Sequence, residues 1–305
     1  MGRPFGVGSC HDPCPRPPSA PMTLDPAAEA ALIEAVRAAA RTEILPRFRD
    51  PGAAAEIKTG LDDLVTEADR GAERAIGRAV AGILPEAAVV GEEAVEHDRS
   101  ILDAIGRAGT AVIVDPVDGT WNFAKGIATF GVILAVTKGG ETVFGLLYDP
   151  VLDDWVAARK GGGAWYGGGA RAERPLRLAD PLPMGGFRGY ASPFLFPRGA
   201  QERLAVEFLR LGGRTGSLRC SCHEYRQMAL GHAAFTLSAQ MKPWDHAAGA
   251  LVVEEAGGAV GVLDGAAYAP TRHEGVLIAA ESASLLAELQ ERFAWLNETA
   301  EVQRR

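Results

Sequence analysis

The nine residues DPVDGTWNF, Asp115 to Phe123, directly follow the apolar run AVIV at 111–114. Two carboxylates, Asp115 and Asp118, therefore stand at the end of what the sequence predicts to be a buried strand. Charges in such a place are costly unless a cation or a hydrogen-bond network compensates them. The stretch predicts that something is bound at the end of this strand.

The composition limits the classes of protein to consider. The chain has 305 residues, 47% of them hydrophobic, enough for the core of one large domain or of two lobes. A net charge of −8 without a long basic run argues against a nucleic-acid partner. No apolar stretch approaches the roughly 20 residues that span a bilayer. Four cysteines, at 10, 14, 220 and 222, do not form a disulfide framework, so we expect a cytoplasmic protein.

The first 22 residues are rich in glycine and proline and lack hydrophobic periodicity, so we expect a disordered tail over 1–22. Cys10, His11 and Cys14 are metal-ligand types, but nothing nearby completes a site. The segment lacks the apolar core of a signal peptide, and Met22 is an alternative start. We expect a second, short tail over 301–305.

Helices and strands alternate along the rest of the chain. Asp25-Pro26 is a typical helix start, and Pro46 is expected to end that helix. A second helix is predicted from about Thr66 to Leu84. Short apolar runs at 87–90 and 111–114 suit buried strands.

The segments GVILAVT, ETVFGLLY and DWVAAR predict a meander of antiparallel strands, with Gly139-Gly140 as a two-residue hairpin turn. A later part of the chain mixes helices with the strands GAVGVL and GVLIAA and ends in a helix from Ser282. The pattern is that of an α/β (α+β) protein with layered architecture. We expect an N-terminal α+β lobe over 23–175 and a C-terminal α/β lobe over 176–300.

Acidic residues recur in four segments: GLDDLVTEAD (60–69), VVGEE (89–93), DPVDGT (115–120) and PWDHAAG (243–249). The last three lie just past an apolar strand or at a helix start, where α/β proteins build their sites. Oxygen ligands from several segments suit a hard cation, Mg²⁺ before Ca²⁺ or Zn²⁺.

Each motif also has a simpler interpretation. DPVDGT can be a plain turn, VVGEE a solvated loop, and WDHAAG an ordinary helix cap closed by Gly257-Gly258. An EF-hand does not fit DPVDGT, because Val117 and Gly126 fall where that loop needs oxygen ligands. A haloacid-dehalogenase-type phosphatase does not fit either, because its two carboxylates are separated by one residue and these by two.

Together, the segments resemble the inositol monophosphatase family of the lithium-sensitive phosphatase superfamily. The resemblance covers most of residues 25–300 and is carried by DLVTEAD at 63–69, GEE at 91–93, DPVDGTWNF at 115–123 and WDHAAGALVVEEAGG at 244–258. It implies a layered αβαβα sandwich of the inositol-monophosphatase and fructose-bisphosphatase type, Mg²⁺ dependence and a homodimer.

The resemblance also implies a set of site residues. The metal ligands would be Glu92, Asp115, the carbonyl of Val117, Asp118 and Asp245. Their four carboxylates, with a phosphate monoester, would be roughly balanced by two or three Mg²⁺ ions. Pro116 is expected to turn the chain off the strand, so that Asp115 and Asp118 converge on one side.

In the family, a metal-activated water attacks the phosphate monoester. Glu92 and Thr120 would orient and deprotonate this water, and Asp69 would hold the Thr120 hydroxyl. Gly119 and Thr120 would open a short helix whose free N–H groups bind the phosphate oxygens. Lys58 is a weaker candidate for a residue that approaches the site.

The substrate-binding segments depart from the inositol phosphatase pattern. Ser238 and Lys242 stand where those enzymes carry a Glu and a His, and SCHEYR, at 221–226, replaces a Gly-Thr-Ala-Ala segment. Lys242, His223 and Arg226 predict a more cationic pocket, for a substrate with an additional anionic group. The alternative is that Glu224 and Arg226 pair with each other on a helix face.

An inositol-monophosphate-like metabolite, histidinol phosphate, fructose bisphosphate and nucleotide-linked phosphates therefore all remain open as substrates. An alternative from another class is a non-catalytic homologue that binds Mg²⁺ without turnover. The intact set of Glu92, Asp115, Asp118, Thr120 and Asp245 argues against it, because a protein that only binds the ion does not need the water-orienting pair.

Overall fold

The computed structural model describes residues 23–50, 55–60, 63–169, 172–178, 187–211 and 214–298. The predicted tails over 1–22 and 301–305, with Cys10, His11 and Cys14, lie outside these residues, as does the side chain of Lys58. None of the described helices is long and apolar enough to cross a membrane.

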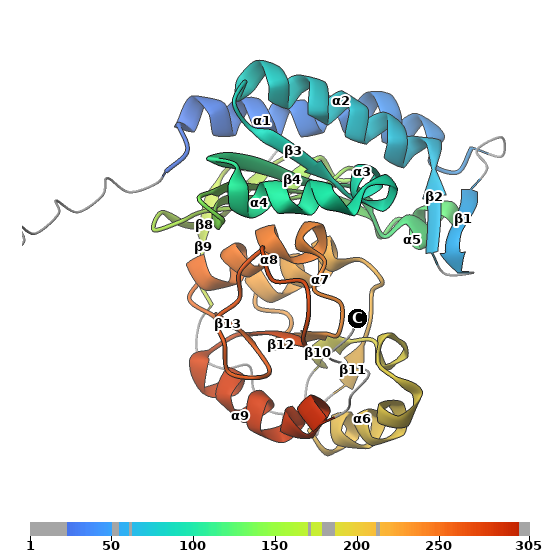
Figure 1. Ribbon diagram of the computed structural model, residues 1–305, viewed down its shortest axis with the longest axis vertical. Coiled ribbons are helices and arrows are strands. Elements are labelled where there is room, and N and C mark those ends of the chain that lie inside the picture. Colours follow the sequence, from blue (N-terminus) through green and yellow to red (C-terminus); the bar gives the residue numbers. More distant parts are fainter. Residues whose placement is uncertain are drawn as a thin grey trace, which may run out of the picture.

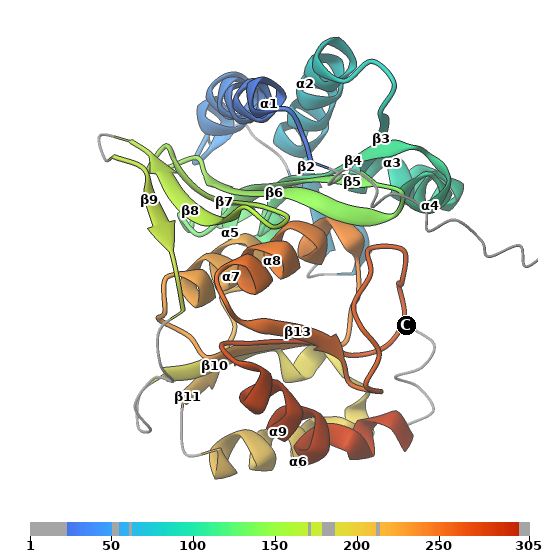
Figure 2. The ribbon, with the colours of Figure 1, turned by 90° about the vertical axis from the view of Figure 1, so that its left-hand side faces the viewer.

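Five layers stack in the order helix, sheet, helix, sheet, helix, as Figures 1 and 2 show. The first layer is α1 (Pro26–Ala39) and α2 (Glu67–Ile83), which cover the outer face of a seven-stranded sheet. Helices α7 (Ser221–Ala229) and α8 (Pro243–Glu255) lie between this sheet and a five-stranded one, with α3 (Glu92–His97) and α4 (Ala104–Arg107) beside them. The last layer is α6 (Arg198–Arg210) and α9 (Ala283–Phe293). The predicted αβαβα architecture is confirmed.

The seven-stranded sheet follows the chain order from β3 to β9. Its strands are β3 (Ala88–Gly91), β4 (Thr110–Asp118), β5 (Gly131–Lys138), β6 (Glu141–Asp149), β7 (Asp154–Arg159), β8 (Gly163–Gly168) and β9 (Arg174–Leu176). β3 and β4 are parallel, and every later neighbour is antiparallel. The predicted meander is therefore confirmed. Gly139 and Gly140 have φ of 57° and 83°, the left-handed values that a two-residue hairpin turn requires.

The five-stranded sheet has the order β11-β10-β12-β14-β13, which does not follow the chain. Its strands are β10 (Phe187–Ala191), β11 (Arg214–Gly216), β12 (Phe235–Ser238), β13 (Ala259–Val262) and β14 (Leu277–Ala280). β10 pairs in parallel with β11 and β12, and β14 pairs antiparallel with β12 and β13. A small hairpin of β1 (Ala55–Gly60) and β2 (Asp63–Thr66) precedes α2. The predicted lobe boundary at 175–176 stays a prediction.

The helix starts follow capping rules. Asp25 accepts the N–H of Ala27 at the start of α1, and Thr66 and Asp69 form a capping box at the start of α2. The predicted end of the first helix at Pro46 is late, because the regular α-helix α1 ends at Ala39. A wider π-helical turn over 40–44 and a tighter 3₁₀ turn over 45–47 follow it. α8 is almost entirely buried, since α7 and both sheets surround it.

Candidate functional site

A bulge in β4 places Asp115 and Asp118 on the same side of the sheet. Asp115 pairs with Ile133 and Asp118 with Gly131, so β4 has one more residue than β5 between these pairs. An additional residue reverses the alternation of side chains along a strand. The expectation that Pro116 turns the chain off the strand is wrong, because β4 continues through Pro116 to Asp118. The bulge brings the two carboxylates together.

The first turn of α8 adds Asp245 to this pair. Oxygen atoms of Asp115, Asp118 and Asp245 all lie within 4.8 Å of one another. Asp115 and Asp118 are 2% and 7% exposed. Burial, followed by the charges of Glu92, Asp118 and Asp245, raises the pKa of Asp115 well above its ordinary value. Burial and the charge of Asp245 raise the pKa of Asp118 to about 7.

Asp118 is held by the start of α7. Its Oδ2 accepts the N–H of Cys222 and, at 3.1 Å, the thiol of Cys220. Burial raises the pKa of the Cys220 thiol well above its ordinary value, so the thiol keeps its proton and remains a donor. These contacts direct Asp118 Oδ2 toward α7, which gives the carboxylate one orientation. The sequence motifs did not indicate this role for the SCHEYR segment.

Glu92 is the first residue of α3, at the margin of the cluster. Glu73 of α2 fixes this helix start, because its carboxylate accepts the N–H groups of Glu93 at 2.9 Å and Ala94 at 3.1 Å. Glu92 lies close enough to Asp115 to raise the pKa of that carboxyl. Nζ of Lys242 is 3.9 Å from Glu92 Oε1. Glu73 was not among the residues that sequence reasoning selected.

Thr120 and Asp69 meet beside the carboxylates. The Thr120 hydroxyl lies 3.1 Å from Asp69 Oδ1 and 2.9 Å from the carbonyl oxygen of Val117, and it can donate to either. Asp69 is fully buried and also accepts the backbone N–H of Thr66 at 2.8 Å. The carboxylate is therefore fixed by the cap of α2. Gly119 precedes Thr120 with φ of 87°, and a side chain there would meet Thr129 O at 3.0 Å.

The donor set fits a hard divalent cation. Three converging carboxylates and the nearby Val117 carbonyl are oxygen ligands of the type that Mg²⁺ prefers. Burial, together with mutual repulsion, raises the pKa values of Asp115 and Asp118, and a bound cation would offset both effects. Asp115, Val117, Asp118 and Asp245, with Glu92 at the margin, could hold the ion. Their role as ligands stays a prediction.

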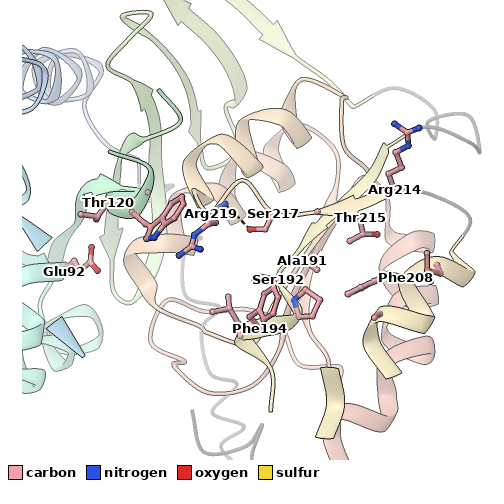
Figure 3. Close-up of a pocket in the computed structure, with 17 residues that line it drawn as sticks. Glu92, Thr120, Ala191, Ser192, Phe194, Phe208, Arg214, Thr215, Ser217 and Arg219 are labelled. Carbon is pink, nitrogen blue, oxygen red and sulfur yellow. Dashed lines mark hydrogen bonds between the residues drawn. The ribbon is translucent and has the colours of Figure 1, made fainter. Parts of the chain in front are cut away.

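A pocket of about 1240 Å³ is lined by Glu92, Gly119 and Thr120, next to this cluster, and by residues of the five-stranded sheet. Figure 3 shows Glu92 and Thr120 at one end of it and Arg214 and Phe208 at the other, with Arg219 and Ser217 between them. The guanidinium of Arg219 lies over the Trp121 ring, 4.2 Å from its centroid. The segments of residues 191–195 and 214–219 supply much of the lining, and no motif in the sequence indicated them.

The chain matches the inositol monophosphatase family over residues 25–294. It belongs to this family. A fructose-1,6-bisphosphatase/inositol-1-monophosphatase of Thermotoga maritima is 30% identical over 206 residues, 67% of this chain and 73% of that one. The Nus factor SuhB of Salmonella typhimurium is 30% identical over 238 residues, 76% of this chain and 84% of that one.

A crystal structure of extragenic suppressor protein suhB from Bartonella henselae has the same fold. Its TM-score is 0.72 at 23% identity, and the match covers 87% of this chain and 98% of that one. The inositol monophosphatase family is metal-dependent, which agrees with the carboxylate cluster.

For this member of the inositol monophosphatase family, the predicted contact between Arg226 and substrate is wrong. Arg226 is 4% exposed and forms an ion pair with Asp154 of β7, and its Nη1 donates to Leu147 O at 2.9 Å. The alternative Glu224–Arg226 pair is also wrong, because Glu224 accepts the N–H of Leu218 at 2.8 Å. His223 lies inside as well, with Nε2 3.1 Å from Phe130 O.

Ser238 and Lys242 also lie outside the described lining of the pocket. The Ser238 hydroxyl donates to Gln240 O at 2.9 Å in the turn after β12. Lys242 caps the start of α8 and faces Glu92. The prediction that these side chains bind a substrate is therefore not supported by their positions, because their polar atoms face a local turn and the carboxylate cluster.

Arg226→Met is expected to destabilise the protein by about 3–5 kcal/mol, because it leaves the buried Asp154 carboxylate without its partner. Denaturant unfolding measures this loss. The double variant Arg226→Met with Asp154→Leu should recover much of it, since neither charge remains buried. An unchanged unfolding midpoint in the single variant would show that the pair is not structural.

Proposed function

We propose that the protein is a Mg²⁺-dependent phosphomonoesterase that hydrolyses a small phosphorylated metabolite by attack of an activated water. The observation that carries this proposal is the juxtaposition of three converging carboxylates with a Thr120–Asp69 pair 3.1 Å apart. A cation site alone does not need a hydroxyl fixed by a buried carboxylate. A hydrolytic site does, because its water must be oriented.

The chain's own residues then have distinct roles. Mg²⁺, when bound to Asp115, Val117 O, Asp118, Asp245 and Glu92, would supply positive charge to the phosphate oxygens and lower the pKa of water. Thr120 donates a hydrogen bond to Asp69 Oδ1, which leaves a lone pair of its oxygen free to accept a hydrogen bond from the attacking water and so orient it. Glu92, beside the cluster, accepts the proton that this water loses. The water oxygen bonds to phosphorus as the bond to the leaving oxygen breaks. That oxygen takes up a proton from solvent water, and Glu92 returns its own proton to solvent.

The phosphate itself would lie at Gly119 and Thr120. Both residues line the pocket next to Glu92, and Gly119 brings the chain close without a side chain. We propose an inositol-monophosphate-like metabolite as the substrate, with histidinol phosphate, fructose bisphosphate and nucleotide-type phosphates as alternatives in the same family. The name of the Thermotoga maritima relative joins two such activities.

A panel of these phosphate monoesters, assayed for phosphate release with and without Mg²⁺, tests the proposal. We expect release from at least one substrate with Mg²⁺ and none in the presence of a chelator. Mg²⁺ binding without any turnover would favour the alternative from another class, a non-catalytic homologue. One relative is named as a Nus factor, which is the observation that favours this alternative. A cytoplasmic homodimer remains part of the proposal.

Lys242→Ala is expected to act through the cation site and equally on all substrates, because Nζ lies 3.9 Å from Glu92 Oε1. Removing this competing charge should lower the Mg²⁺ concentration for half-maximal activity by up to about fivefold, the size of a partly exposed ion pair. A magnesium titration of activity measures the shift, and Lys242→Arg is the control that keeps the charge. A rise in KM for one substrate alone would instead place Lys242 in the substrate pocket.

A further inference from the structure

The pocket is larger than a phosphate and a small sugar need. Its volume of about 1240 Å³ exceeds the roughly 300–1,000 Å³ typical of small-molecule sites. Glu92 and Thr120 lie at one end (Figure 3), and Gly119 also lines the pocket. The remaining space extends along residues 191–195 and α6, so a ligand that fills it must project a long leaving group away from the phosphate.

One side of this extension is apolar, whereas Arg214, Thr215 and Ser192 add polar groups to its lining. Phe194, Leu195, Ala205, Phe208 and Leu209 line it together with Ala191. Phe194 is 83% exposed and Leu209 is 78% exposed, although both are large hydrophobic side chains. Exposed apolar groups around a hollow that is continuous with a reactive site are typical of a ligand pocket.

The segment around Leu218 and Arg219, between the two ends of the pocket, is fixed by several contacts. Arg219 has a left-handed φ of 54°, which is uncommon outside glycine, and its guanidinium stacks on Trp121. Asn122 of α5 (Thr120–Ala124) donates to Leu218 O at 2.8 Å, and Glu224 accepts the Leu218 N–H. Backbone strain held in place by such contacts is a frequent feature of functional sites. The path from Thr120 to the apolar end is therefore lined by a fixed segment.

We propose that the physiological substrate is a phosphate monoester whose leaving alcohol carries an extended apolar or aromatic group. This group packs against Phe194 and Leu209, while the phosphate lies at Gly119 and Thr120. The proposal rests on the proposed phosphomonoesterase function and adds the substrate class. Phe194 and Leu209 are then specificity-determining residues, which touch the leaving group and not the reacting atoms.

The test compares two phosphates with similar leaving alcohols, 3-phenylpropyl phosphate and ethyl phosphate. We expect the intact protein to prefer the first by about tenfold or more in kcat/KM, the range that small apolar differences give. Phe194→Ser and Leu209→Ser should each reduce this preference through KM, with kcat for ethyl phosphate unchanged. Leu152→Ser is the matched control, because Leu152 is 65% exposed but outside the pocket lining.

Calorimetry with the non-hydrolysable 3-phenylpropylphosphonate and ethylphosphonate measures the same preference without turnover. A higher affinity for the phenylpropyl compound, lost in Phe194→Ser, would support the inference. If neither phosphate is hydrolysed in that case, the proposed function alone fails. Equal affinity for both phosphonates would overturn the inference. So would an unchanged preference in Phe194→Ser accompanied by a lower oligomeric state, because the apolar end would then be covered by a second copy of the chain.

Discussion

Asp118→Asn is expected to remove most phosphatase activity and most Mg²⁺ binding while the protein still folds. Asp118 lies within 4.8 Å of Asp115 and Asp245, and an amide supplies neither its charge nor its second oxygen ligand. Loss of an outer partner of a metal ligand costs about 10–100-fold in affinity or activity, so loss of a ligand itself should cost more. Phosphate release and calorimetric titration with Mg²⁺ measure the two effects.

Asp245→Asn should give the same result from a different element. Asp103→Asn is the matched control, since Asp103 is exposed and pairs only with Arg107 among the contacts described for it. Hydrolysis at the wild-type rate by Asp118→Asn or Asp245→Asn would remove the residue from the site.

Although Asp118→Asn should lose activity, it should gain stability when a chelator is present. The folded state holds the pKa of Asp118 at about 7, above the ordinary 3.8, so it binds the proton more tightly than the unfolded state does. This contribution is complete below pH 4 and is lost as the pH rises through 7. Asp118→Asn should therefore melt at a higher temperature than wild type at pH 8 and lose less stability between pH 4 and pH 8. Thermal scans over this range check the expectation.

Thr120→Ala is expected to lower kcat by about 10²–10⁴-fold with little change in Mg²⁺ affinity. The hydroxyl lies between Asp69 Oδ1 and Val117 O, where it would orient water, and it is not itself a predicted ligand. General acid–base groups contribute rate factors of this size. Steady-state kinetics at saturating Mg²⁺ and a separate Mg²⁺ titration distinguish the two effects.

Thr120→Ser is the matched control, because serine keeps the hydroxyl and should retain most of kcat. Asp69→Asn should resemble Thr120→Ala in kcat, with unfolding measured in parallel because Asp69 also accepts the Thr66 N–H. If Thr120→Ala instead raises the Mg²⁺ requirement and keeps kcat at saturation, Thr120 belongs to the ligands of the ion.

Sequence patterns predicted the turns and helix starts, which depend on residues close together in the chain. Gly139-Gly140 requires left-handed backbone, and it does mark the β5–β6 hairpin. Asp25-Pro26 and Thr66 mark helix starts because caps act within three residues. The order of the five-stranded sheet could not be predicted in this way. β12 pairs with β10 and β14, and neither neighbour is adjacent to it in the chain.

The candidate site also combines features set by neighbouring residues with features set by distant ones. The motif DPVDGT predicted two converging carboxylates, but the cause is a bulge defined by partners on β5, which the motif does not contain. Arg226 was expected in the pocket because SCHEYR stands where inositol phosphatases carry a segment that lines the substrate pocket. It is buried because Asp154, 72 residues earlier in the chain, supplies its counter-charge. The apolar side of the pocket joins two separate segments, 191–195 and 205–209, whose individual sequences have no distinctive pattern.

Because residues at the start of α7 hydrogen-bond to Asp118, formation of the proposed cation site depends on the assembly of the whole chain. Asp118 and Cys222 are 104 residues apart, and Asp245 follows later on α8. Closing so long a loop has an entropic cost, so the carboxylates converge only after both sheets and the helices between them have assembled. An ion bound there has affinity for the native chain and not for the unfolded one. Free magnesium at 100 times its dissociation constant would then add about 2.7 kcal/mol to the stability of the native chain. The amount of this protein that survives proteolysis in a cell would thus depend on the magnesium supply, even where its substrate is absent.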